Sequence, residues 1–184
     1  MPAAAPVSRD ALARALADEG DRLYALALRV TRDADLAADA VQEAFAAALA
    51  HAGEFRGGSR LGTWLHRIVY TKSIDLLRRR QRDVPLDEAG EDAVERRDTL
   101  VPTWARPPDE ILLGREARAA FDRALEGLTP LQRAVLTLRE IEGLGGDETA
   151  AILGLSSGSV RVHLHRARMR LQALLAPYFR EERR

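Results

Sequence analysis

A short helix, a glycine turn and a long helix follow one another near the end of the sequence, and this pattern constrains the fold most. The spacing predicts a helix over 147–153, and Gly154 provides the left-handed backbone that a tight turn between crossed helices needs. Ser156 or Ser157 caps the next helix, which we expect to end at Pro177. These lengths are typical of a helix-turn-helix.

The long helix has two different faces. At 100° per residue, one side collects five apolar residues that we expect to be buried, namely Val160, Leu164, Ala167, Leu171 and Leu174. Val162 lies on the opposite face, where a solvated surface does not explain an apolar residue. A recognition helix explains it, because apolar groups contact thymine methyls while arginines pair with guanine. The pattern favours duplex DNA as the ligand, with packing or partner docking as the alternative.

Serine hydroxyls and free amides at the start of this helix suit DNA phosphates. The candidate duplex-contacting residues are therefore Ser157, Ser159, Arg161, Val162, His165 and Arg166. A metal site at His163 and His165 is excluded, because residues two apart on a helix point about 200° from one another.

Helices are also predicted through the rest of the sequence. In the N-terminal part we expect helices over about 11–30, 34–50 and 59–80, with Asp33 or Asp35 capping the second. Before the helix-turn-helix, a helix from Asp109 ends with Gly127 as its C′ residue, and Thr129-Pro130 starts another that stops at Gly143. No segment alternates with period two, so the fold class is all-α.

The stretch 83–108 differs from its surroundings, with four prolines, seven acidic residues and no periodicity. We expect a flexible linker here, although Trp104 is unusual in a solvated segment. The predicted organisation is a helical domain over 8–82, the linker over 83–108 and a helix-turn-helix domain over 109–178.

Charge is distributed unevenly although the formal net charge is zero. Residues 60–82 carry +6 and residues 157–184 carry +5, whereas 8–54 and 83–148 carry −4 and −8. Two basic blocks separated by acidic ones predict two nucleic-acid surfaces. The absence of cysteine excludes disulfides and thiolate chemistry, and no catalytic arrangement is present. We expect no cofactor, no enzymatic activity, no membrane segment and a soluble cytoplasmic protein.

Several short motifs occur in a fixed order across residues 10–175. They are DAVQEAF from Asp39, FRGGS from Phe55, TWLHRI from Thr63, DLLRRR from Asp75, LTPLQRAVL from Leu128 and GSVR from Gly158. As a set they closely resemble the extracytoplasmic-function (ECF) sigma factors. The resemblance implies a dissociable promoter-specificity subunit of bacterial RNA polymerase, built from two helical domains and controlled by an anti-sigma factor.

The resemblance also assigns surfaces. Asp39, Gln42 and Glu43 resemble the contact with the β′ coiled-coil of core polymerase, and the second domain is expected on the β flap. The glycine-rich loop and the following helix resemble the part that melts DNA and recognises the minus-10 element as a single strand. Its candidate residues are Arg56, Ser59, Arg60, Thr63, Lys72, Arg78, Arg79 and Arg80.

Two aromatic residues and one rival function stay open. Trp64 and Tyr70 could stack on bases, although Trp64 lies on an apolar stripe that favours core packing. A response-regulator-type activator would carry a similar helix-turn-helix, but its N-terminal half would be an α/β receiver domain. The resemblance places the second domain on the minus-35 element, where Val162 replaces the small polar residue that family members often carry.

Overall fold

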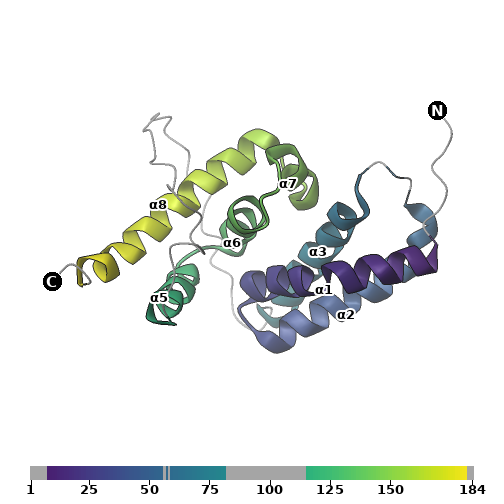
Figure 1. The fold of residues 1–184 in the computed structure, drawn as a ribbon, viewed down its shortest axis with the longest axis horizontal. Helices are drawn as coiled ribbons and strands as arrows, with labels where there is room; N and C mark the ends of the chain where they lie inside the picture. Colours follow the sequence, from purple (N-terminus) through teal and green to yellow (C-terminus); the bar gives the residue numbers. More distant parts are fainter. Residues whose placement is uncertain (1–7, 56, 58, 82–114, 182–184) are drawn as a thin grey trace.

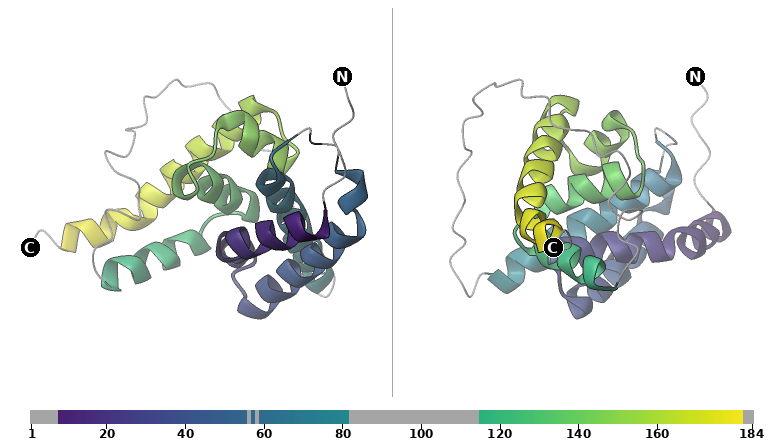
Figure 2. Two further views of the ribbon diagram at one scale, coloured as in Figure 1. Left: turned by 45° about the vertical axis from the view of Figure 1, so that its right-hand side comes forward. Right: turned by 60° about the vertical axis from the view of Figure 1, so that its left-hand side comes forward.

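A computed structural model of the chain describes residues 8–55, 57, 59–81 and 115–181, and the predicted linker lies outside these ranges. Every regular element in the described residues is helical, which confirms the all-α prediction. The helices form an N-terminal and a C-terminal unit that lie side by side (Figure 1; Figure 2, left). None of the described helices is both long and apolar enough to cross a membrane.

The N-terminal unit consists of α1 (Arg9–Thr31), α2 (Ala34–Ala50), the 3-10 turn η1 (Ala52–Glu54) and α3 (Leu61–Gln81). Asp33, one of the two predicted caps, caps α2 by accepting hydrogen bonds from the amides of Asp35 and Leu36. Alanines on the inner face of α2 let the three helices approach closely, and the core between them consists mainly of alanine and leucine. This unit presents α3 to the C-terminal half.

The C-terminal unit comprises α5, α6, the π turn η2, α7 and α8, spanning Arg115–Glu126, Pro130–Leu136, Thr137–Ile141, Gly146–Leu153 and Ser157–Glu181. A complete capping box at Thr129 starts α6. The left-handed Gly154, with φ of 69°, ends α7, and the Ser156 hydroxyl accepts from the Ser159 amide at the start of α8. The predicted helix-turn-helix is thus present.

Two predictions about α8 need correction. Helix α8 passes through Pro177 to Glu181; proline removes a single amide donor, and the preceding turns are already fixed by packing. Leu174 is 41% exposed and Leu175 is buried instead, because α5 covers that side of α8. Helix α5 ends at Glu126, so the predicted end at Gly127 is confirmed, although Gly127 itself does not adopt a left-handed conformation.

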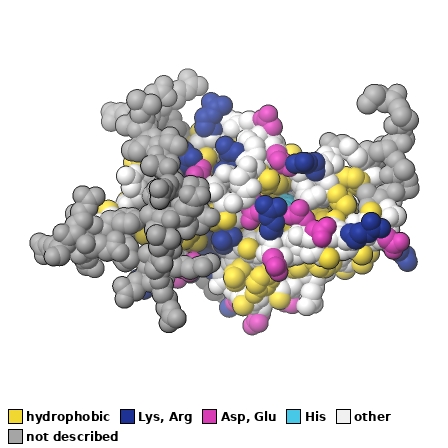
Figure 3. Space-filling model, in the orientation of Figure 1, with side chains coloured by type: hydrophobic (Ala, Val, Ile, Leu, Met, Phe, Trp, Pro, Cys, Tyr) yellow, Lys and Arg dark blue, Asp and Glu magenta, His cyan; other side chains and the backbone are white. Residues whose placement is uncertain are grey.

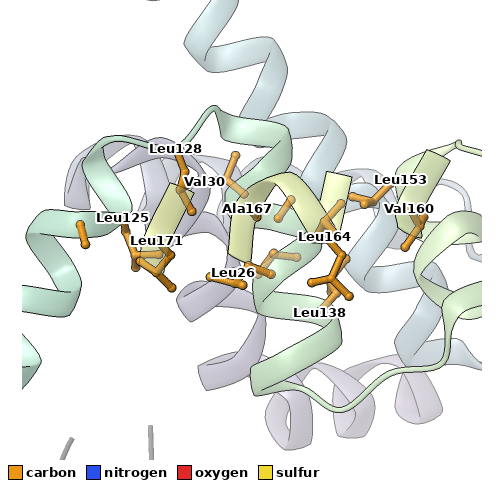
Figure 4. Packing of buried hydrophobic residues seen from close by; sticks show 14 of the residues in the cluster. Leu26, Val30, Leu125, Leu128, Leu138, Leu153, Val160, Leu164, Ala167 and Leu171 are labelled. Atoms are coloured by element: carbon orange, nitrogen blue, oxygen red, sulfur yellow. The ribbon is translucent and has the colours of Figure 1, made fainter. Parts of the chain in front are cut away.

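The two units share one hydrophobic core. Leu26 and Val30 of α1, both fully buried, lie among leucines of α5, α6, η2 and α8 (Figure 4). The buried Arg133 guanidinium donates to the carbonyl of Val30 across the junction (2.9 Å) and to the carbonyl of Leu128. Burial lowers the pKa of Arg133 to about 10, with a smaller contribution from the nearby charge of Arg32.

Candidate nucleic-acid interface

The outer face of α8 lies away from the core. Arg161 is exposed, and Val162, His165 and Arg166 are half-buried. Met169 on the same side is 49% exposed. The apolar stripe on the opposite side is buried as predicted at Val160, Leu164, Ala167 and Leu171. The helix therefore presents a mixed basic and apolar surface of the kind that fits a DNA groove.

The two candidate serines at the start of α8 bond within the motif. The exposed Ser157 hydroxyl donates to Asp147 Oδ1 at 2.5 Å, which ties the two helices of the motif together. The Ser159 hydroxyl lies 2.9 Å from that of Ser156. The Ser159 amide is itself bonded to the Ser156 hydroxyl, so other amides of the first turn would have to bind a phosphate.

Two other side chains of α8 turn inward. Arg168 pairs with Glu140 of the π turn, so this arginine fixes α8 to its own unit. Burial, followed by the charge of Arg166, lowers the pKa of His163. Across the described residues, no group of three or more His, Asp or Glu side chains could hold a metal ion.

The basic residues of α3 are paired with acids of the same unit. Glu43 on α2 lies 3.2 Å from both Lys72 Nζ and Arg79 Nη1. Arg80 pairs with Asp33, the capping residue of α2. The Leu36 amide and then Arg80 lower the pKa of Asp33. Three of the predicted minus-10 residues, Lys72, Arg79 and Arg80, thus lie on the same part of α3, and each forms an ion pair with an acidic side chain of the protein.

The remaining minus-10 candidates lie at the two ends of α3. Arg78, Ser59 and Arg60 are exposed, and Arg56 lies outside the described residues. Thr63 is buried, and its hydroxyl donates to Glu148 Oε1 of α7 at 2.6 Å. The Thr63 side of the first turn of α3 thus faces the other unit, and not solvent.

The two aromatic candidates pack within the protein. Trp64 joins the core of the N-terminal unit, with its ring centroid 5.3 Å from that of Phe55, in agreement with the core-packing interpretation. Tyr70 packs against the core shared by the two units, and burial raises the pKa of its hydroxyl. In this arrangement neither ring is presented for base stacking.

The candidate polymerase contact is accessible on α2. Asp39 and Gln42 are exposed, while Glu43 is half-buried because of its two ion pairs. The patch formed by Asp39, Gln42 and Glu43 thus includes one residue, Glu43, that also pairs with cations of α3.

Sequence reasoning missed the residues that join the units. Arg22 of α1 pairs with Glu142 (Nε–Oε2 2.8 Å), and Arg32 donates to the carbonyl of Asp122 (2.8 Å) and pairs with Glu126. Figure 3 shows acidic and basic side chains interspersed where the units meet. The paired residues lie in two stretches that are both net acidic, so the charge distribution along the sequence gave no signal for this pairing.

Two family matches cover most of the described chain. Sigma-70 region 2 matches residues 16–83, and Sigma-70 region 4 matches residues 118–171. The RNA polymerase sigma-H factor of Pseudomonas aeruginosa is 34% identical, over 87% of this chain and 83% of its own length. The ECF RNA polymerase sigma factor SigE of Mycolicibacterium smegmatis is 35% identical, over 97% of this chain and 65% of its own length.

Solved structures with the same arrangement contain a second protein. One is the sigma factor RpoE in complex with the anti-sigma factor NepR from Bartonella quintana, with a TM-score of 0.67 and 28% identity over 89% of this chain and 95% of that chain. Another is CnrH in complex with the cytosolic domain of CnrY, with a TM-score of 0.64 and 26% identity over 92% of this chain and 90% of that chain.

Proposed function

Because the chain belongs to the extracytoplasmic-function subfamily of RNA polymerase sigma factors, we propose that it binds core polymerase and directs transcription from promoters through two separate helices. Sigma factors are initiation factors and not catalysts. The outer face of α8 carries the proposal, because its basic and apolar residues are accessible while the opposite stripe is buried. The proposal places the protein in the cytoplasm, where polymerase and promoters are.

Helix α8 is proposed to contact the minus-35 element as duplex. Arg161 and Arg166 would pair with guanine edges or phosphates, and Val162 would contact a thymine methyl. The hydrogen bond from Ser157 to Asp147 supports this function, because it fixes the angle between α7 and α8. The amides at the start of α8 would hold a backbone phosphate and set the helix position.

Helix α3 and the loop before it are proposed to contact the minus-10 element as a single strand. The cations of its second half, Lys72 and Arg78 to Arg80, form a basic edge suited to a phosphate backbone. Arg56, Ser59, Arg60 and Thr63 would contact the strand near the glycine-rich loop. Melting then follows from binding the separated strand more tightly than the duplex.

The polymerase contact is proposed at Asp39, Gln42 and Glu43 on α2. An exposed acidic and amide patch on a rigid helix fits a basic coiled-coil such as that of β′. The domain over 109–178 would contact the β flap, and the segment 83–108 would join it to the domain over 8–82.

An anti-sigma factor is the proposed regulator. The two solved structures named above each hold the similar chain in complex with another protein, and the first names that protein as an anti-sigma factor. A pull-down from unstressed cells should recover a protein that inhibits transcription by this chain. Recovery of no such inhibitor would contradict this part of the proposal.

In vitro transcription with core polymerase on a genomic fragment library tests the whole proposal. Specific transcripts are expected with wild type, and D39K/Q42K should abolish both transcripts and core binding. We choose Gln42 and not Glu43 because Glu43 also holds Lys72 and Arg79. The control D35K/A50K alters two exposed residues of the same helix with the same total charge change. Duplex binding by the free chain without any core-dependent transcript would instead indicate an activator.

A further inference from the structure

A cavity of about 340 Å³ lies between α1, the start of α3 and the segment that leads from the π turn into α7. This volume is within the range of small-molecule binding sites. Its wall carries more carboxylates than guanidinium groups, contributed by Glu19, Glu142 and Glu148 and by Arg22 and Arg60. We propose that the cavity is a binding site for a small aliphatic diamine, a ligand class that the proposed function does not include.

The buried imidazole of His66 is the first group that indicates a ligand. His66 is 5% exposed, and its Nδ1 lies 2.9 Å from the carbonyl oxygen of Gly62. Because a carbonyl oxygen can only accept, Nδ1 is the donor of this bond, and Nε2 of the neutral ring is an acceptor. This Nε2 is buried and has no hydrogen-bond partner among the residues that the structure describes. The ring therefore lacks a donor on the side of Nε2.

The carboxylate of Glu19 is the second such group. Its Oε2 is also buried without a hydrogen-bond partner in the described ranges, and Arg22 Nη1 lies 3.6 Å from it. Gly62 lets this carboxylate approach the start of α3, because a Cβ at that position would lie 3.4 Å from Glu19 Oε1. Glu19 and His66 both line the cavity. Two acceptors from different helices thus border one space, and neither bonds to the other.

The remaining bonds around the cavity leave negative charge in excess. Arg22 Nε pairs with Glu142 Oε2 at 2.8 Å, so Glu19 shares this guanidinium with a second acid. Glu148 accepts a hydrogen bond from the Thr63 hydroxyl at 2.6 Å, and a hydroxyl does not neutralise its charge. Carboxylates that are partly withdrawn from water need a cation. The cavity therefore favours a ligand with positive charge.

A diamine fits this set of groups. One ammonium has three N–H donors, which suffice for Glu19 and His66 together, and the other would pair with Glu148. An anionic ligand would meet three carboxylates, whereas Arg60 is exposed and its charge is screened by water. A metal ion fits less well, because no group of three or more His, Asp or Glu side chains in the described residues could hold one.

The position of the site gives its occupation a consequence for the proposed function. The cavity also borders Thr63 and Arg60, which that proposal assigns to the minus-10 element. A bound diamine would place positive charge beside these residues. Binding itself is a property of the free chain, so its measurement needs neither polymerase nor promoter.

Calorimetric titration of the free chain with 1,4-diaminobutane tests the site. The titration is made at about pH 8, where an ordinary imidazole is neutral and an aliphatic ammonium is charged. Saturable binding of one diamine per chain is expected. 1,4-Butanediol has the same length without the charge, and sodium chloride at equal ionic strength controls for screening. No saturable binding, or equal binding of the diol, would overturn the proposal.

The variant E19Q locates the binding. It removes the unpartnered carboxylate at nearly constant shape and should weaken diamine binding roughly tenfold. D18N, which neutralises an exposed acid on the same helix, should keep the affinity of wild type. Since Glu19 Oε2 has no hydrogen bond to lose, E19Q should unfold at or above the temperature of wild type without ligand. The diamine should then raise the unfolding temperature of wild type and D18N more than that of E19Q. Equal affinities of E19Q and D18N would refute the site.

Nitrogen NMR of the imidazole rings adds a local measurement. The chain has four histidines, and H66Q assigns the signals of His66 by their loss. Adding 1,4-diaminobutane should shift Nε2 of His66 and leave His51, His163 and His165 unchanged. An unchanged His66 signal at saturating diamine would overturn the proposal even if calorimetry detects binding. Failure of any of these tests leaves the proposed function untouched, because that function is tested by core-dependent transcription.

Discussion

The two basic helices of this chain, α3 and α8, differ in whether their positive side chains form ion pairs within the protein. On α3, Lys72, Arg79 and Arg80 each pair with an acid of the same unit, and the first turn is covered by α7. On α8, Arg161 is exposed and has no partner among the residues that the structure describes. One helix therefore has to exchange partners before it binds DNA, whereas the other presents its charge directly.

The ion pairs on α3 contribute little to the stability of the fold. Surface ion pairs such as those of α3 contribute about 0–1 kcal/mol each, so a phosphate backbone can replace them readily. The contacts that join the units are of another kind, because they include a buried guanidinium and a shared apolar core. Specificity for single strands can thus depend on covering α3 rather than on weakening its charge.

The largest effect is expected from Arg133→Met, which tests whether the units that carry α3 and α8 are held together as one packed body. The change leaves the carbonyls of Val30 and Leu128 without this donor while keeping most of the volume. We expect the free energy of unfolding to fall by about 2–4 kcal/mol in urea denaturation. Arg170→Met on the exposed side of α8 is the control; an equal effect of both variants would mean that the junction contributes little.

The variants Arg161→Ala and Arg166→Ala test the proposed DNA-binding face of α8. Each should weaken binding to a minus-35 duplex, taken from a promoter found by library transcription, by about 1–3 kcal/mol. Fluorescence anisotropy at several salt concentrations separates base contacts from phosphate contacts, because only the latter reduce the salt dependence. Unchanged affinity in both variants would remove this face of α8 from the interface.

The variant Glu43→Gln tests the ion pairs on α3. Loss of one carboxylate releases Lys72 and Arg79 together. The free chain should then bind random-sequence single-stranded DNA more tightly by at most about 1 kcal/mol. Asp35→Asn, an exposed acid on the same helix, controls for net charge. If the two variants bind equally, the pairing on α3 has no consequence for DNA.

The smallest effect concerns pH and His163. Its pKa is lowered in the folded chain by burial and by Arg166, so the unfolded chain binds the proton more readily. The free energy of unfolding should therefore rise with pH between the folded pKa and the ordinary value of 6.5. Urea denaturation on either side of that window should show a smaller rise for His163→Gln. An unchanged rise would show that other groups cause it.

Local signals in the sequence predicted most helix ends. Asp33, Thr129 and Gly154 each act in the way that their chemistry indicates, because capping depends on only a few neighbouring residues. Pro177 was misleading for the same reason, since its local preference is outweighed by the packed helix before it. The predicted faces of α8 were right except at Leu174, where the placement of α5 decides.

The junction between the units could not be predicted from the sequence. Leu26 and Val30 have the same spacing as the residues of the N-terminal core, so periodicity alone assigns them there. No local signal marks Arg133 as a buried residue, and the ion pairs of Glu43 join different helices. Candidate site residues were identified by type and position, but their partners depend on tertiary structure.

The π turn between α6 and α7 has a consequence for recombining this chain with its relatives. The Glu142 amide bonds to the Thr137 carbonyl at 2.9 Å, so this turn holds one residue more than an α-helical turn. Loss of one residue there would rotate everything that follows by about 100° and carry Glu148 away from Thr63. A chimera that exchanges the C-terminal helices should therefore be spliced after Gly143, because segment length and not similarity sets the orientation of the graft.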